Sequence, residues 1–414
     1  MIRSFPSWMS NAANRVLIPK NGVDYRCKVV LAPMVRSGEL PSRLLALHYG
    51  ADLVWGPETI DKAMIGTTRR FDPVTSTVVF TRFPSNSSRP PNPDQKESVI
   101  FRLHPEKEHG KLIYQIGTAS PTLAVEAAKL VAADVAGIDV NSGCPKPFST
   151  SGGMGAALLR TPDLLCSILE ALVKEVGQVY EIGISVKIRL LETPELTRSL
   201  VERLCKTGIT GLTIHCRTTP MRPRERAIRE QLRMIGGICR EAGVACLMNG
   251  DVINRDEALK LAEEFGVDGG MIATAAEANS SVFRSLADGG AAPWTEVVHE
   301  YMKYALEVDN KWGNTKFLLA QLMPGKSDIA KKLPQAKNHS QVCEILELGD
   351  LLELAREVDS RLGILEMPVS GVEKAKKNST AAKAAGSGPA KQHGKEERKP
   401  LSQRGVVGTP TMAV

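Results

Sequence analysis

Ala136-Gly-Ile-Asp-Val140 is a short apolar run that stops at the loop Asn141-Ser-Gly-Cys144-Pro and is followed, after further glycines, by a helical pattern from Pro162 to Leu172. A strand, a loop and a helix in this order form the repeating unit of parallel α/β folds. Glycines on both sides of Cys144 let the loop move and let a substrate approach the backbone. Cys144 is therefore a candidate catalytic residue, and a small buried hydrophobe is the alternative.

The same unit recurs along the chain. Short apolar runs, rich in the β-branched residues of parallel strands that are buried on both faces, alternate with amphipathic helical stretches. The predicted strands are Lys28–Ala32, Asp52–Trp55, Lys111–Ile116, Ala136–Val140, Ile182–Lys187, Gly211–His215, Val244–Met248 and Gly269–Ala273. Eight β/α units over roughly 250 residues are typical of a TIM (β/α)8 barrel, which is the fold class that we predict.

The segments outside these units define the domain organisation. We expect a disordered leader over residues 1–24, the barrel over 25–292 and an insertion at about 66–110. The connection from Asp61 to Gly110 is expected to contain a helix, a short β excursion around Val78–Phe83 and an irregular stretch. Residues 293–365 predict a small all-α domain. Its helices are expected at Thr295–Asn310, Thr315–Met323, Ser340–Glu347 and Leu351–Leu362.

The basic residues are concentrated in the last segment, residues 366–414. From Lys374 onward there are nine Lys and Arg residues against Glu396 and Glu397, which accounts for the whole net charge of +7. This segment is also rich in Ala, Gly, Ser and Pro and cannot bury enough apolar surface to fold. We predict a disordered basic tail with affinity for a polyanion, and a solvated tail without a partner is the alternative.

Composition restricts the compartment. No apolar run reaches the ~18 residues of a membrane span, so we expect no membrane association. The eight cysteines contain no C-x-x-C pair, which argues for a reducing compartment and against a metal site. We expect a cytoplasmic protein, with the nucleus as a second location. A short targeting peptide, or a true start at Met9, is the alternative for the leader.

Polar residues follow nearly every predicted strand, at the end where TIM barrels carry their functional groups. Asn249-Gly-Asp251 and Ala273-Thr274 follow the last two strands, and their backbone N–H groups suit a phosphate dianion. Lys187 and His215 face the centre, where a cation can stabilise a reduced flavin, and Gln115 can hydrogen-bond a planar heterocycle. For His215, a satisfied core histidine is the alternative.

An ordered set of motifs over about residues 26–362 resembles the tRNA-dihydrouridine synthases. The motifs are Leu31-Ala-Pro-Met34, Gln115-Ile-Gly117, Asp139-Val-Asn-Ser-Gly-Cys-Pro-Lys146, Gly152-Gly-Met-Gly-Ala-Ala-Leu158, Val186-Lys-Ile-Arg189, His215-Cys-Arg217 and Asn249-Gly-Asp251. In the helical domain, Tyr304-Ala305, Asp309-Asn310 and Asn314-Thr-Lys316 look like the eukaryotic branch that modifies position 20 of the D-loop.

The resemblance implies a flavin-dependent oxidoreductase. A TIM barrel would hold FMN, NADPH or NADH would reduce it, and hydride would pass to C6 of a uridine extruded from tRNA while Cys144 protonates C5. The helical domain would bind tRNA, and we expect a monomer.

The resemblance also implies roles for individual residues. The expected FMN contacts are Pro33, Met34, Val35, Gln115, Lys187, His215, Asn249, Gly250, Asp251, Ala273 and Thr274. The expected contacts to the target uridine or to tRNA phosphates are Asn141, Arg189, Arg217, Arg222 and Arg224. For the arginines after His215, a solvated basic face is the alternative.

The chain also departs from the family pattern. Ala273-Thr274 stands where an arginine is common, and Cys216 stands where glycine is common. Nothing after Ile364 could form the double-stranded-RNA-binding domain of animal members, so the chain resembles a fungal or protist member. Two other functions stay open: a flavin-dependent reductase of a free pyrimidine or small enone, and a non-catalytic tRNA-binding factor.

Overall fold

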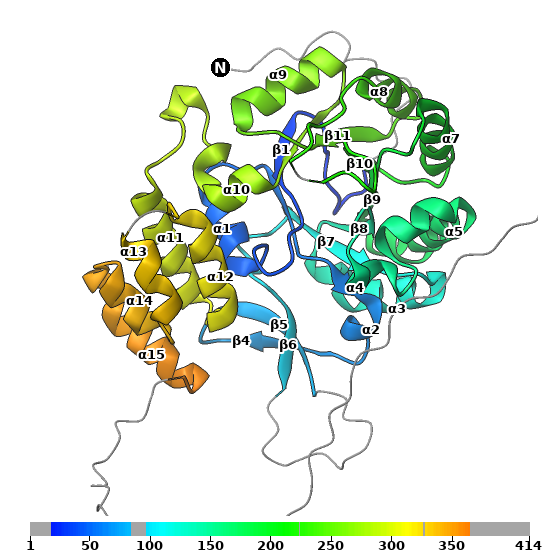
Figure 1. Cartoon of the computed structure of the whole chain (residues 1–414). Helices are drawn as coiled ribbons and strands as arrows, with labels where there is room; N and C mark the ends of the chain where they lie inside the picture. Colours follow the sequence, from blue (N-terminus) through cyan, green and yellow to red (C-terminus); the bar gives the residue numbers. More distant parts are fainter. Residues whose placement is uncertain (1–17, 84–96, 223, 326–327, 365–414) are drawn as a thin grey trace, which may run out of the picture. The chain divides into compact units, whose positions relative to one another are not determined.

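The computed structural model describes residues 18–83, 97–222, 224–325 and 328–364. Its main feature is a closed sheet of parallel strands surrounded by helices (Figure 1). The order β2-β1-β12-β11-β10-β9-β8-β7 is closed by pairing of β2 with β7, and a short strand, β3 (Thr59–Ile60), extends the β7 edge. The barrel strands are β1 (Lys28–Leu31), β2 (Leu53–Trp55), β7 (Leu112–Gly117), β8 (Gly137–Ser142), β9 (Gly183–Arg189), β10 (Gly211–His215), β11 (Ala245–Asn249) and β12 (Gly269–Ile272). The predicted TIM barrel is confirmed.

Strands β8 and β9 each run two residues further than the sequence predicted, and both carry site residues. Strand β8 ends at Ser142 and β9 at Arg189, because the parallel pairing continues with Asn141 opposite Lys187 and Ser142 opposite Ile188. Asn141 and Arg189 therefore project from strands, which hold a side chain more firmly than a loop does.

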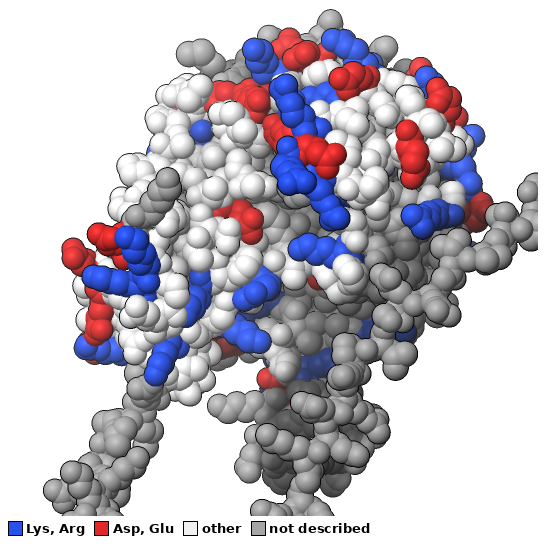
Figure 2. Space-filling view, viewed as in Figure 1, with Lys and Arg blue, Asp and Glu red and all other residues white. Residues whose placement is uncertain are grey.

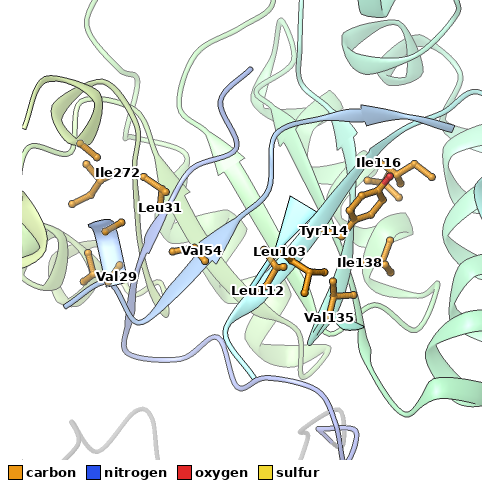
Figure 3. Packing of buried hydrophobic residues seen from close by; sticks show 14 of the residues in the cluster. Val29, Leu31, Val54, Leu103, Leu112, Tyr114, Ile116, Val135, Ile138 and Ile272 are labelled. Atoms are coloured by element: carbon orange, nitrogen blue, oxygen red, sulfur yellow. The ribbon is translucent and has the colours of Figure 1, made fainter. Parts of the chain in front are cut away.

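Alternation along the strands separates an outer and an inner layer. Val29, Leu31, Val54, Tyr114 and Ile116 point outward into the large core between the sheet and its helices (Figure 3). The intervening side chains point inward, and a smaller apolar cluster of Val30, Leu53, Trp55, Ile113, Leu247 and Met271 fills the barrel interior with Tyr25. Because the side-chain period is two, the polar residues at the strand ends also face inward.

Helices cover the outer face of the sheet, as the connections of parallel strands require. They are α1 (Leu40–His48), α3 (Pro121–Val131), α5 (Pro162–Leu172), α6 (Gln178–Tyr180), α7 (Pro194–Cys205), α8 (Leu232–Glu241), α9 (Arg255–Phe265) and α10 (Thr274–Ala278). Thr193 and Asn254 cap α7 and α9 by accepting the N–H groups of Leu196 and Glu257. Thr161 is the N-cap residue of α5, but its side chain accepts no N–H group of that helix, and its hydroxyl donates to the Leu158 carbonyl.

The insertion is more regular than the sequence predicted. Helix α2 (Asp61–Met64) precedes it, and it contains an antiparallel sheet in the order β4 (Thr68–Asp72), β5 (Thr77–Arg82) and β6 (Ser98–Leu103). Of the three strands, only β5 was predicted. Phe80 and Phe101 face each other across β5 and β6, and both are buried, so tertiary packing stabilises a sheet whose single strands look weak in the sequence. Residues 84–96 lie outside the described residues.

The C-terminal helices are α11 (Trp294–Glu307), α12 (Trp312–Leu322), α13 (Asp328–Lys332), α14 (His339–Ile345) and α15 (Leu352–Leu362). A buried polar group joins them: Asp359 accepts from His339 Nδ1 at 2.8 Å, and His339 Nε2 lies 3.3 Å from Thr315 Oγ1. Helix α11 packs on α1, and its Val297 and Met302 belong to the same apolar core as the outer barrel layer. These helices are therefore fixed to the barrel through a shared core.

The two ends of the chain are described only in part. Within the predicted leader, Asn21 N–H donates to the Glu181 carbonyl at 2.8 Å and Val23 is buried, so residues 18–24 pack on the barrel. Residues 1–17 and the predicted basic tail lie outside the described residues. None of the described helices is long and apolar enough to cross a membrane.

Candidate active site

The carboxyl ends of the barrel strands surround a cavity of about 460 Å³. It collects most of the site residues predicted from the sequence, because the inward-facing residue at the end of each strand points to the same axis. Glu58, Lys146, Phe148 and Phe317 also line it. The predicted residues in its lining are Pro33, Met34, Val35, Gln115, Asn141, Cys144, Lys187, Arg189, His215, Asn249, Ala273 and Thr274.

The loop that carries Cys144 is held by hydrogen bonds at both ends. Asn141 Oδ1 accepts the N–H groups of Gly143 at 3.0 Å and Cys144 at 3.1 Å. Arg189 Nε donates to the Gly143 carbonyl at 2.6 Å. The Cys144 carbonyl accepts the N–H of Ala156 at 2.9 Å. The glycines of this loop suggested mobility in the sequence, whereas the structure shows a tightly positioned turn.

Gly155 has a direct steric role in this turn. Its φ is +58°, and a Cβ atom there would lie 2.6 Å from the Cys144 carbonyl oxygen and 2.4 Å from Ser149 Oγ. A side chain would therefore displace the segment around the thiol. Glycine at this position allows close approach of two backbone segments.

The Cys144 thiol is partly buried between groups of both signs. Burial raises its pKa above the ordinary value, and the nearby Glu58 carboxyl adds to this rise. A hydrogen bond from the Lys146 backbone and the Arg189 guanidinium act in the opposite direction. The thiol is consequently protonated at neutral pH and suited to donate a proton.

Glu58 is a site residue to which the sequence analysis assigned no role. It lies in the break between β2 and β3, where Gly56-Pro57 interrupts the strand, and its Oε1 accepts from Ser149 Oγ at 3.1 Å. Burial raises the pKa of its carboxyl, while hydrogen bonds from Ser149 and Asn141 lower it. The Gly-Pro break in an apolar strand was the available sequence signal.

Lys187 supplies positive charge on one wall of the cavity. Burial and, to a lesser extent, the Arg189 guanidinium lower its pKa to about 8, and the buried Asp139 carboxyl opposes this shift. Burial and the cations Lys187, Arg189 and Arg217 lower the pKa of His215 to about 2. His215 is therefore neutral, and of this predicted pair only Lys187 is a cation at neutral pH.

The side chain of Gln115 is oriented by the buried carboxyl group of Asp139. Its Nε2 donates to Asp139 Oδ2 at 2.8 Å, and Ser185 Oγ donates to Asp139 Oδ1 at 2.7 Å. Burial raises the pKa of Asp139 to about 6, against the lowering effect of these two bonds and of Lys187. The network fixes the Gln115 amide at the cavity wall.

Five predicted residues do not line the cavity: Gly250, Asp251, Arg217, Arg222 and Arg224. Asp251 Oδ1 accepts from Arg217 Nη2 at 2.5 Å, and its Oδ2 accepts the N–H of Ala227 at 2.8 Å. Arg217 Nε also donates to the Glu225 carbonyl at 2.7 Å. These contacts shape the loop after β10, on which Arg222 and Arg224 are exposed.

Basic and acidic side chains are mixed on the face of the molecule drawn in Figure 2. Figure 2 shows Lys and Arg over the C-terminal helices and around the middle of this face, where acidic side chains lie among them. Within the described residues, no group of three or more His, Cys, Asp or Glu side chains could hold a metal ion. The fold and the cavity together define a TIM-barrel enzyme whose site combines a protonated thiol with a buried lysine.

Comparison with known proteins gives the family. Residues 30–336 match the model of the dihydrouridine synthase (Dus) family. The chain belongs to this family.

Three relatives are informative. The chain is 50% identical over 331 residues to the tRNA-dihydrouridine(20) synthase [NAD(P)+] of Schizosaccharomyces pombe, covering 79% of this chain and 66% of that protein. It is 46% identical over 330 residues to the protein of the same name from Saccharomyces cerevisiae, covering 78% and 84% of the two chains. The tRNA-dihydrouridine(20a/20b) synthase [NAD(P)+] of S. cerevisiae is 26% identical over 318 residues, or 75% and 76%.

Proposed function

We propose that this chain is a tRNA-dihydrouridine synthase, which reduces a uridine of tRNA to 5,6-dihydrouridine, with position 20 of the D-loop as the target. Family membership and the two relatives named for position 20 support this function. The observation that carries it is the position of Cys144: its loop is held by Asn141 and Arg189, and it lines the same cavity as Lys187 and Gln115.

The residues of the cavity fit FMN as the cofactor. The amide of Gln115 can hydrogen-bond a flavin ring, and the Lys187 ammonium can stabilise negative charge on it. Backbone N–H groups at Ala273 and Thr274, where α10 begins directly after β12, suit a phosphate. FMN, once reduced by NADPH or NADH, would supply the hydride.

The protein's own step is the proton transfer. Addition of hydride to C6 of uracil places negative charge on the C5–C4–O4 unit, and the Cys144 S–H bond then breaks as its proton forms a bond to C5. The thiolate that remains is stabilised by the Lys146 backbone N–H and the Arg189 guanidinium, which lower the pKa of the thiol. Solvent returns the proton before the next turnover.

A uridine within tRNA reaches this site only after leaving its stack. The reactive groups lie inside a cavity at the barrel mouth, and extrusion of a base costs roughly a few kcal/mol. Binding of the rest of the tRNA to the protein must offset that cost.

The proposal is tested with the FMN-loaded protein under anaerobic conditions. We expect NADPH to bleach the flavin absorbance and undermodified tRNA to restore it, with dihydrouridine found by mass spectrometry at position 20. The Cys144→Ala variant should still be bleached but should lose about 10²–10⁴-fold in tRNA-dependent reoxidation. Equally efficient reoxidation by free uridine would indicate a small-molecule reductase, and failure to bind FMN would indicate a non-catalytic tRNA-binding protein.

A further inference from the structure

Phe148 is an exposed aromatic residue at the mouth of the catalytic cavity. It lies in α4 (Pro147–Thr150), four residues after Cys144, and its side chain is 46% exposed while lining the same cavity as the thiol. The other exposed phenylalanines of the described residues, Phe71 and Phe83, are 55% and 56% exposed, belong to the insertion and do not line the cavity. Phe148 therefore differs from them by its position beside the reactive group.

The ring of Phe148 has no stacking partner among the described residues. Among the described residues, no cation or aromatic ring lies over it. By contrast, Phe317 of α12, which also lines the cavity, carries the Arg36 guanidinium at 4.3 Å from its ring centroid. One face of the Phe317 ring is thus covered by Arg36, whereas the Phe148 ring is available to a ligand that enters the cavity.

We propose that Phe148 is a substrate-binding residue that stacks on a nucleobase adjacent to the uridine that is reduced. This inference rests on the proposed function. Extrusion of a nucleotide removes a stacking partner from each of its neighbours in the strand, and an aromatic side chain can replace that partner for any base. Such stacking contributes about 5- to 150-fold in affinity per base.

The exposed position of Phe148 indicates that it contacts the neighbouring base and not the uridine that is reduced. The uracil ring that reacts must lie beside Lys187 and Gln115, which project from barrel strands, and beside Cys144 on the loop after β8. Phe148 lies at the exposed rim of the cavity. The strand on either side of an extruded nucleotide has to pass over that rim. The exposed Lys146, next to Phe148 along the α4 segment, provides a cation for the phosphodiester that passes there.

The kinetic test compares Phe148→Ala, Phe148→Tyr and the control Phe71→Ala with undermodified tRNA. We expect kcat/KM for tRNA to fall about tenfold in Phe148→Ala, to stay close to wild type in Phe148→Tyr because the ring is retained, and to be unchanged in Phe71→Ala. Wild-type activity in Phe148→Ala would overturn the inference. So would an equal fall in the rate of flavin reduction by NADPH, because it would assign the ring to the nicotinamide.

A photochemical test locates the base. 5-Iodouridine is placed in the tRNA either at the target position or at each neighbouring position, and the irradiated complex is digested and mapped by mass spectrometry. We expect the peptide with Phe148 to be linked to a neighbouring position in wild type and not in Phe148→Ala. A link from the target position alone would overturn the inference. Absence of dihydrouridine formation by the wild type would instead count against the proposed function itself.

Discussion

Arg189 Nε lies 2.6 Å from the carbonyl oxygen of Gly143, the residue that precedes Cys144. The same guanidinium donates from Nη1 to the Thr218 carbonyl at 3.1 Å, and Arg189 is only 9% exposed. A single planar donor group at the end of β9 therefore joins the loop after β8 to the loop after β10. Its position as much as its charge determines where the thiol lies.

Arg189→Lys is expected to slow the protonation step. A lysine ammonium at the end of a flexible chain cannot reproduce two fixed bonds to two carbonyls, so the Cys144 loop loses its register, and a misplacement of about 1 Å costs as much as ~10²-fold in rate. Stopped-flow reoxidation of reduced flavin by tRNA measures this rate. The control is Arg198→Lys, an exposed α7 residue, and equal rates in both variants would contradict the positioning role.

Glu58→Gln is expected to lower the pKa of the Cys144 thiol. The ionised carboxyl disfavours the thiolate, so its removal lets the thiol ionise at lower pH. The pH dependence of alkylation by iodoacetamide, followed by mass spectrometry of the Cys144 peptide, measures this shift. In the matched control Glu202→Gln on α7, the pH profile of alkylation should stay as in the wild type. An unchanged profile in Glu58→Gln as well would show that the Glu58 carboxyl does not affect the pKa of the thiol.

FMN affinity of the apoprotein is expected to fall as pH rises through about 8, the pKa of Lys187. The folded pKa lies below the ordinary lysine value, so the ammonium is present below pH 8 and is lost above it, and a bound anionic group moves the midpoint upward. Quenching of FMN fluorescence measures the affinity. Lys187→Met should bind more weakly with no inflection near this pH, and an inflection that persists in the variant would assign the titration elsewhere.

Glu108→Gln is expected to destabilise the fold without touching the cavity. Arg43 Nε donates to Glu108 Oε1 at 2.6 Å, and both side chains are at most 1% exposed. Loss of one charge leaves the other buried and unpaired, at a cost of about 3–5 kcal/mol in the free energy of unfolding. Urea denaturation measures it. The exposed Arg198–Glu202 pair, removed by Glu202→Gln, should cost about 0.3–0.5 kcal/mol, and equal losses would contradict this reasoning.

Local patterns predicted much of the fold. Parallel strands that are buried on both faces have a distinctive composition, and each predicted barrel strand overlaps an observed one. The antiparallel strands β4 and β6 were missed, because Arg69 and Arg70 in β4 are exposed and its stability comes from pairing with β5. A strand that depends on its neighbour leaves a weak signal in its own residues.

The sequence by itself determined the barrel, the inward direction of Gln115, Lys187 and His215, and the importance of the loop with Cys144, since a side-chain period of two and the common strand direction suffice for these. Only the tertiary structure decided which site residues are charged at neutral pH and which loops are fixed by hydrogen bonds. The neutrality of His215 comes from its burial and from three nearby cations, Lys187 and Arg189 on β9 and Arg217 on the loop after β10. The role of Glu58 comes from its contact with Ser149, 91 residues away. Burial and long-range contacts set these properties, and neither is encoded in local spacing.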